Sequence, residues 1–217
     1  MASSKALPTV LVLALDPLTQ NMSLDFLINK ADVTFVTTEA EACDYLQSQR
    51  FTAILVVDPT ITDESPNLRR QVTTFAKTGG RVILCHYFAS LVRFPDFDDY
   101  MQIEWDLPWR YGCYSREDFH LNRQGVNLCR KPGLPARYSM KAVRLKSVEP
   151  SSKIYYPPDT ACIQPHVLSG DKYRPISEST EAGIAFTRIG DGWLGYIGDV
   201  NDEEATLTVV LAMIRKA

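Results

Sequence analysis

The chain has little of what marks several common protein classes. Its 217 residues include three histidines, and its five cysteines are an odd number scattered without CxxC spacing, which argues against a disulfide framework or a zinc site. The 23 basic residues are spread among 26 acidic ones, so we expect no binding of nucleic acid or of an anionic membrane. No apolar run approaches the roughly 20 residues of a membrane span. We expect a cytoplasmic protein without metal or cofactor.

What is present is a regular alternation of two patterns. A hydrophobic content of 45% is enough to bury a core, so we expect residues 1–217 to form a single domain. Strands that alternate with helices form parallel, doubly wound sheets with helices on both faces, an α/β fold of the flavodoxin-like type. Apolar runs predict strands over 9–15, 33–36, 51–57 and 81–85, and helical spacing predicts helices over 19–30, 38–49 and 66–78.

The alternation stops after this first part of the chain. Residues 94–138 are rich in aromatics, proline and aspartate and have no sustained period, which predicts an irregular insertion, a usual place for a substrate lid or a partner surface. A β-hairpin is expected over 182–197 and an amphipathic helix over 203–215. The acidic run 199–204 between them is either a cation-binding loop or a helix start that suits the helix dipole.

The segment from Thr78 to Ser90 is the predicted centre of the chain. A Gly-Gly stop, a short apolar strand and then small residues indicate a helix, a buried strand, a sharp turn and a new helix. Ligands of open parallel sheets bind beyond the carboxyl ends of the strands. Cys85 and His86 are therefore candidate catalytic residues.

Each of these two side chains has alternative roles. Cys85 is either a thiolate activated at a helix N-terminus or an inert, buried strand residue. His86 can face Asp16, Asp58 or Asp199, which all follow predicted strands. Such a pairing gives a general base or a mononuclear metal site, or else a structural hydrogen bond in which the aspartates cap turns. The catalytic candidates are Cys85, His86 and Asp16.

Part of the predicted insertion has the composition of a ligand site. Trp105, Trp109 and Tyr114 offer ring faces that stack on a sugar or nucleotide, and Arg110 and Arg116 suit an anion. The alternative is an aromatic mini-core that ties down the loop. These five residues are the ligand-binding candidates for a small molecule.

Two stretches resemble the class I glutamine amidotransferase-like superfamily, especially its ThuA-like branch. The strand end Ile83 to His86 is similar to the Gly-Ile-His strand end of that branch, and Gly192 to Asp199 is similar to its glycine-rich final hairpin. The resemblance extends over residues 8–90 and 182–215. It implies that His86 occupies the elbow at which true amidotransferases carry the nucleophilic cysteine.

The chain departs from the catalytic pattern of that superfamily. A glutaminase needs a downstream His-x-Glu to activate the thiol, and none of His86, His120 and His166 lies in such a motif. Leu84 stands where the working elbow has glycine, and Pro59 offers no N–H to an oxyanion hole. We therefore do not expect glutaminase activity.

Three functions remain open from the sequence. The first is a non-catalytic amidotransferase-like module for binding or assembly. The alternative is a small-molecule hydrolase or lyase that uses Cys85 or His86 with Asp16 under an aromatic lid. The third, compatible with the first, is a homodimer whose contact surface is the insertion.

Overall fold

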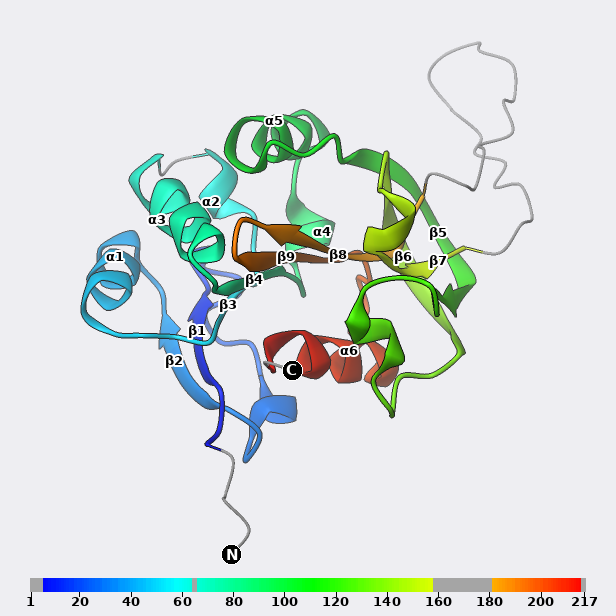
Figure 1. The fold of residues 1–217 in the computed structure, drawn as a ribbon. Coiled ribbons are helices and arrows are strands. Elements are labelled where there is room, and N and C mark those ends of the chain that lie inside the picture. The colour runs from blue at the N-terminus through cyan, green and yellow to red at the C-terminus, as the bar shows by residue number, and fades with distance from the viewer. Residues whose placement is uncertain (1–5, 64–65, 158–180, 216–217) are drawn as a thin grey trace, which may run out of the picture.

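The computed structural model describes residues 6–63, 66–157 and 181–215. Over these residues the strands form one mixed sheet in the order β2-β1-β3-β4-β9-β8-β7-β5-β6 (Figure 1). The parallel part consists of β2 (Asp32–Val36), β1 (Thr9–Leu13), β3 (Ala53–Val56), β4 (Arg81–Leu84) and β9 (Gly192–Ile197). The antiparallel part adds β8 (Ile184–Ile189), β7 (Lys153–Tyr156), β5 (Arg110–Leu121) and β6 (Arg137–Lys146). The predicted α/β fold with a mostly parallel core is confirmed.

The parallel strands are apolar throughout because both faces of the sheet are covered. Leu11 and Leu13 of β1 belong to one hydrophobic cluster and Val10 and Val12 to the other. Figure 1 places α6 on the opposite side of the sheet from the other long helices. The first cluster is covered by α1 (Glu39–Ser48), α3 (Pro66–Lys77) and α5 (Phe94–Trp105), and the second by α6 (Glu204–Ile214).

Local sequence signals set the ends of the first helices. Thr38 Oγ1 accepts a hydrogen bond from the Glu41 N–H at 3.3 Å, and Glu41 Oε2 accepts one from the Thr37 N–H at 3.2 Å, which together cap α1. Helix α3 ends at Lys77, and Gly79 follows it with a φ of 107°, in the region that favours glycine. The chain can therefore turn at once into β4.

The expected helix over residues 19–30 is wrong. The structure has turns there and a 3₁₀ turn, η1 (Asp25–Leu27). Hydroxyl groups explain the difference, because Thr19 Oγ1 donates to the Asp16 carbonyl and Ser23 Oγ accepts from the Asp25 N–H. Such local bonds offer the backbone an alternative to the helix.

The irregular insertion expected over residues 94–138 is also corrected. The segment contains the twelve-residue helix α5 and the twelve-residue strand β5, so it extends the sheet. A register shift between Tyr111 and Tyr114 interrupts the two-residue alternation of β5. Helix α5 is followed by Asp106, whose φ of 54° lies in the left-handed region where glycine usually ends a helix. Both features hide the regular structure from a pattern search.

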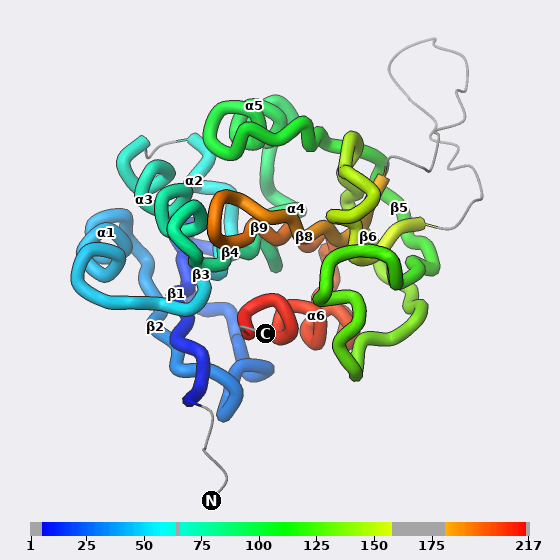
Figure 2. Tube along the Cα trace, in the orientation of Figure 1, coloured from blue at the N-terminus to red at the C-terminus, as the bar shows by residue number. Residues whose placement is uncertain are grey.

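Short helical segments complete the fold. They are α2 (Thr60–Asp63), α4 (Phe88–Leu91), η2 (Asn127–Arg130) and η3 (Pro150–Ser152). Tube and ribbon views agree that the amino-terminal strands and the antiparallel strands lie at opposite ends of the sheet (Figures 1 and 2). Within the described part of the chain, no helix is long and apolar enough to cross a bilayer.

Candidate functional site

A sharp turn follows the central strand β4, which lies between β3 and β9. The Cys85 N–H still donates to the Val56 carbonyl at 3.0 Å, and α4 begins at Phe88, two residues after His86. His86 has a φ of 55°, a left-handed conformation that costs a residue other than glycine about 1–2 kcal/mol. The predicted strand, turn and helix are therefore present, with His86 at the bend.

Cys85 is enclosed below this turn. Its side chain is 1% exposed and belongs to the cluster beneath α6. Burial, and then the negative charge of Asp202, raise the pKa of the Cys85 thiol well above its usual value. A reactive thiolate needs the opposite shift. The surroundings of Cys85 thus favour a protonated, enclosed thiol.

His86 makes a hydrogen-bond contact with a carboxylate across the carboxyl edge of the sheet. Its Nδ1 lies 2.8 Å from Oδ2 of Asp202, in the loop after β9. The His86 Nε2 is buried and has no hydrogen-bond partner among the described residues. The ring of Phe26 lies beside the imidazole, with 5.6 Å between the ring centroids. The carboxylate that faces His86 is therefore Asp202, which the sequence did not single out.

The aspartates after β1 and β3 shape their own loops. The Asp58 side chain is buried, at 1% exposure. Its Oδ2 accepts hydrogen bonds from the Asp16 N–H at 3.1 Å and from the Thr19 hydroxyl at 2.8 Å. Its Oδ1 accepts one from the Thr60 N–H at 3.1 Å. Asp16 Oδ1 accepts from the Leu18 N–H at 2.8 Å. These contacts fit the turn-capping alternative for both aspartates.

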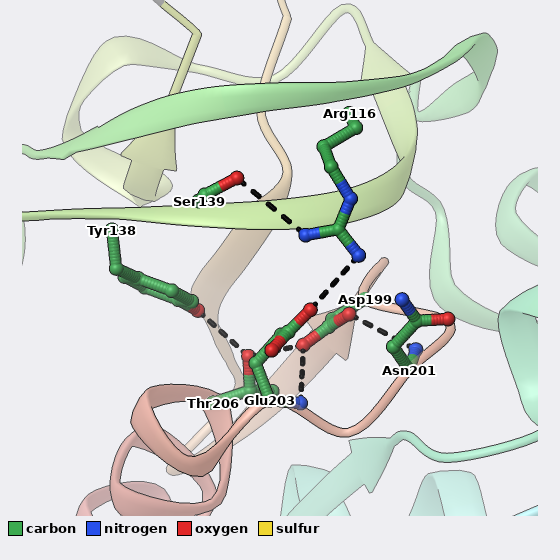
Figure 3. Close-up of polar contacts among 7 residues, drawn as sticks. All are labelled: Arg116, Tyr138, Ser139, Asp199, Asn201, Glu203 and Thr206. Carbon is green, nitrogen blue, oxygen red and sulfur yellow. Dashed lines mark hydrogen bonds and ion pairs between the residues drawn. The ribbon is translucent and has the colours of Figure 1, made fainter.

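Asp199 organises the loop between β9 and α6 (Figure 3). Its carboxylate is fully buried and accepts from the Asn201 N–H at 3.1 Å, from the Glu203 N–H at 2.9 Å and from the Thr206 hydroxyl. Burial is the largest influence on Asp199 and raises its pKa above the ordinary 3.8, against the opposing effect of these hydrogen bonds. We call these four residues the Asp199 network.

Arg116 connects this loop to the antiparallel part of the sheet. Its guanidinium lies 3.0 Å from Glu203 Oε1 and 3.5 Å from the Ser139 hydroxyl (Figure 3). Within the described ranges, no group of three or more His, Cys, Asp or Glu side chains is arranged to hold a metal ion. Of the acids in the run 199–204, Glu203 is thus paired with Arg116, Asp202 with His86, and Asp199 with the donors of its own network.

The remaining ligand-binding candidates separate in the structure. Trp105, the last residue of α5, and Trp109 are each 2% exposed and belong to the hydrophobic cluster that α5 covers. Arg110, the first residue of β5, lies 3.3 Å from Asp98 of α5. Tyr114 is 44% exposed and lines a cavity. Of the five candidates, Tyr114 is the one found among the described lining residues of this cavity.

The cavity has a volume of about 490 Å³ and opens beside the carboxyl ends of β4 and β9. The Lys141 ammonium in its wall lies 5.0 Å from the centre of the Tyr114 ring. We call this cavity the edge pocket. The sequence did not mark most of its lining as ligand-binding, because a single lysine, serine or asparagine carries no signal of a binding role. Its lining residues are Ala89, Ser90, Phe94, Tyr111, Tyr114, Lys141, Val143, Val200 and Asn201.

Comparison with known proteins finds solved structures with a similar fold. No protein-family model and no curated protein matches the sequence. A ThuA-like protein from Bacteroides uniformis superposes with a TM-score of 0.59 at 9% identity, over 99% of this chain and 93% of that one. A GMP synthase-type protein from Thermoplasma acidophilum gives 0.51 at 9% identity, over 97% and 94%. A β-galactosidase from Bacillus circulans sp. alkalophilus gives 0.53 at 13% identity, over 94% of this chain and 30% of the enzyme. At these identities the likeness establishes the fold alone, which this chain shares with these proteins.

Proposed function

We propose that the chain is an amidotransferase-like domain that binds a small molecule and does not hydrolyse glutamine. The observation that carries this proposal is the pair at the elbow, where His86 contacts Asp202 at 2.8 Å above an enclosed Cys85 thiol. An amidotransferase needs an accessible thiolate at the elbow and an imidazole that activates it. Here the elbow carries the imidazole and the loop after β9 carries a carboxylate.

The oxyanion-hole donor and the downstream histidine that a glutaminase needs are also not in place among the described residues. Thr60, after β3, donates its N–H to Asp58 Oδ1, so this donor is not free for an oxyanion. His120 lies on β5, which β9, β8 and β7 separate from β4 in the sheet. His166 lies outside the described residues. These positions support binding without amide hydrolysis.

We expect no glutamine-dependent release of ammonia, because the thiol cannot reach a substrate as a thiolate. The measurement is ammonia release from glutamine and from simple amides by the full chain, beside Cys85→Ser. Both proteins should match the reaction without protein. Turnover by the wild type that disappears in Cys85→Ser would contradict the proposal.

A second candidate function rests on the buried Nε2 of His86, which has no hydrogen-bond partner within the part of the chain that the structure describes. A histidine oriented by a carboxylate is the arrangement of a general base, so the alternative is a hydrolase or lyase that uses His86 with Asp202. In this case 4-nitrophenyl esters should be cleaved by the wild type and not by His86→Gln or Asp202→Asn. If all three proteins leave the esters intact, the module proposal is preferred to the esterase form of this alternative.

Assembly into a homodimer remains a proposal of its own. Exposed apolar side chains lie along the segment from the turn after His86 to the start of α5, with Tyr87 45%, Leu91 38% and Phe94 54% exposed. Surfaces of this kind often mark interaction sites. Light scattering on the full chain tests it, and a monomer at high protein concentration would count against it.

A further inference from the structure

The edge pocket carries an excess of positive charge. Arg116 of β5 and Lys141 of β6 are register partners in the antiparallel pair, and directly opposed like charges are unfavourable in a sheet. Glu203 neutralises Arg116 at 3.0 Å. Among the described residues, Lys141 makes no salt bridge, and no carboxylate lines the pocket. Within the described ranges, the ammonium of Lys141 therefore lacks a counter-charge.

Two carboxylates that contact residues lining the pocket are engaged elsewhere. Asp98 accepts the Tyr111 N–H at 2.8 Å and contacts Arg110. Asp199 is fully buried within its own network. Because both carboxylates already have partners, neither is available to Lys141, and an anionic ligand would supply the missing charge.

Aromatic side chains also line the pocket. The rings of Phe94 and Tyr111 stack with 3.4 Å between their centroids. Phe94 is 54% and Tyr114 44% exposed, so ring surface remains open to a flat ligand. Burial, and then the neighbouring Tyr114, raise the pKa of Tyr111 to about 12. Its phenol thus remains a neutral hydrogen-bond donor in the physiological range.

One wall of the pocket is fixed before any ligand arrives. Asn201, which lines the pocket, donates its N–H to Asp199, and the next residue, Asp202, holds His86. Asp202 has a φ of 52°, a conformation that persists where the surrounding structure determines it. A wall that is already ordered lowers the entropic cost of binding.

On these grounds, and resting on the binding function proposed above, we infer that the edge pocket binds a small aromatic anion. The carboxylate or phosphate group lies at the Lys141 ammonium, and the flat ring lies against Tyr114 and the Phe94–Tyr111 stack. The volume of about 490 Å³ suits a ligand of this size.

The test is isothermal titration calorimetry of the full chain at low ionic strength with benzoate and phenyl phosphate. Benzamide is the neutral aromatic control and inorganic phosphate the anion without a ring. We expect at least one aromatic anion to bind about tenfold more tightly than either control, since a charge-assisted bond and a stacking contact are then both made. The tighter of the two identifies the anionic group as carboxylate or phosphate.

Variants locate the binding. Lys141→Met should weaken binding of the aromatic anion about tenfold, because the charge-assisted bond is lost. Tyr114→Ala should weaken it severalfold, because the stacking contact is lost. Lys146→Met is the matched control, since Lys146 is an exposed lysine of the same strand outside the pocket lining. It should bind like the wild type.

Three outcomes overturn the inference. If benzamide binds as tightly as benzoate and Lys141→Met has no effect, the anion assignment fails while the binding module stands. Equal losses of affinity in Lys141→Met and Lys146→Met would show that the overall charge of the protein, and not a site at Lys141, causes the effect. If no probe binds, the ligand class is rejected, and ammonia release separately decides whether the elbow is a glutaminase.

Discussion

Replacement of Arg144 by methionine is expected to lower the free energy of unfolding by about 3–5 kcal/mol. Arg144 of β6 and Glu181 form an ion pair in which Nε and Oε2 are 3.1 Å apart, and their side chains are 2% and 1% exposed. Removal of one partner leaves the other charge buried and uncompensated. The effect is measured by urea denaturation of the full chain, monitored by tryptophan fluorescence.

The double replacement separates this cause from a packing defect. Arg144→Met with Glu181→Leu removes both charges and keeps apolar volume, so it should recover much of the loss from either single change. The pair flanks the bridge at which Leu145 and Ala182 exchange two backbone hydrogen bonds. If the two single effects simply add in the double variant, or if Arg144→Met costs less than about 1 kcal/mol, the ion-pair account is wrong.

The second large effect is expected from Asp199→Ala, at about 3 kcal/mol. Its carboxylate serves the Asn201 and Glu203 N–H groups and the Thr206 hydroxyl from a fully buried position. Alanine removes the acceptor and leaves these donors without their partner. Asp199→Asn keeps one carbonyl acceptor, so its loss should be smaller. Denaturation curves of the three proteins provide the comparison.

The pH dependence of this difference has a defined sign. Burial raises the pKa of Asp199 above its ordinary 3.8, so the folded state holds this proton more readily than the unfolded state. The resulting stability is fully present below pH 3.8 and is lost as the pH rises through the folded-state pKa. The wild type should therefore exceed Asp199→Asn by more near pH 4 than at pH 7. A difference in unfolding free energy between the two proteins that becomes smaller toward pH 4 would contradict the raised pKa of Asp199.

The parallel part of the fold could be predicted because its signals are local. Runs such as Ala53–Val56 are apolar on both faces, and Gly79 with Gly80 stops the preceding helix. The antiparallel part depends on pairing between distant segments. The register shift after Tyr111 hides the period of β5. That strand becomes visible only with its partner β6.

The same distinction holds for the site. The turn at Cys85 and His86 follows from the end of a short strand, and the sequence places it correctly. The partner of His86 lies 116 residues away, in an acidic run where nothing distinguishes Asp202 from its neighbours. Lys141 was missed because a lysine on a strand normally faces solvent. Its role as a candidate ligand contact becomes visible only in the structure, from its register partner Arg116 and from the neighbouring Tyr114 ring.

The most direct test of the account is a map of backbone amide shifts in ¹H–¹⁵N NMR spectra of the full chain during titration with phenyl phosphate. The account predicts that the largest shifts gather at Ser90, Tyr114, Lys141 and Asn201, around the edge pocket. A second hollow of about 640 Å³ lies at the other end of the parallel strands, lined among others by Gln49, Phe51 and Gly79. Shifts that gather there, or that show no cluster, would contradict a ligand site at the carboxyl edge of β4 and β9.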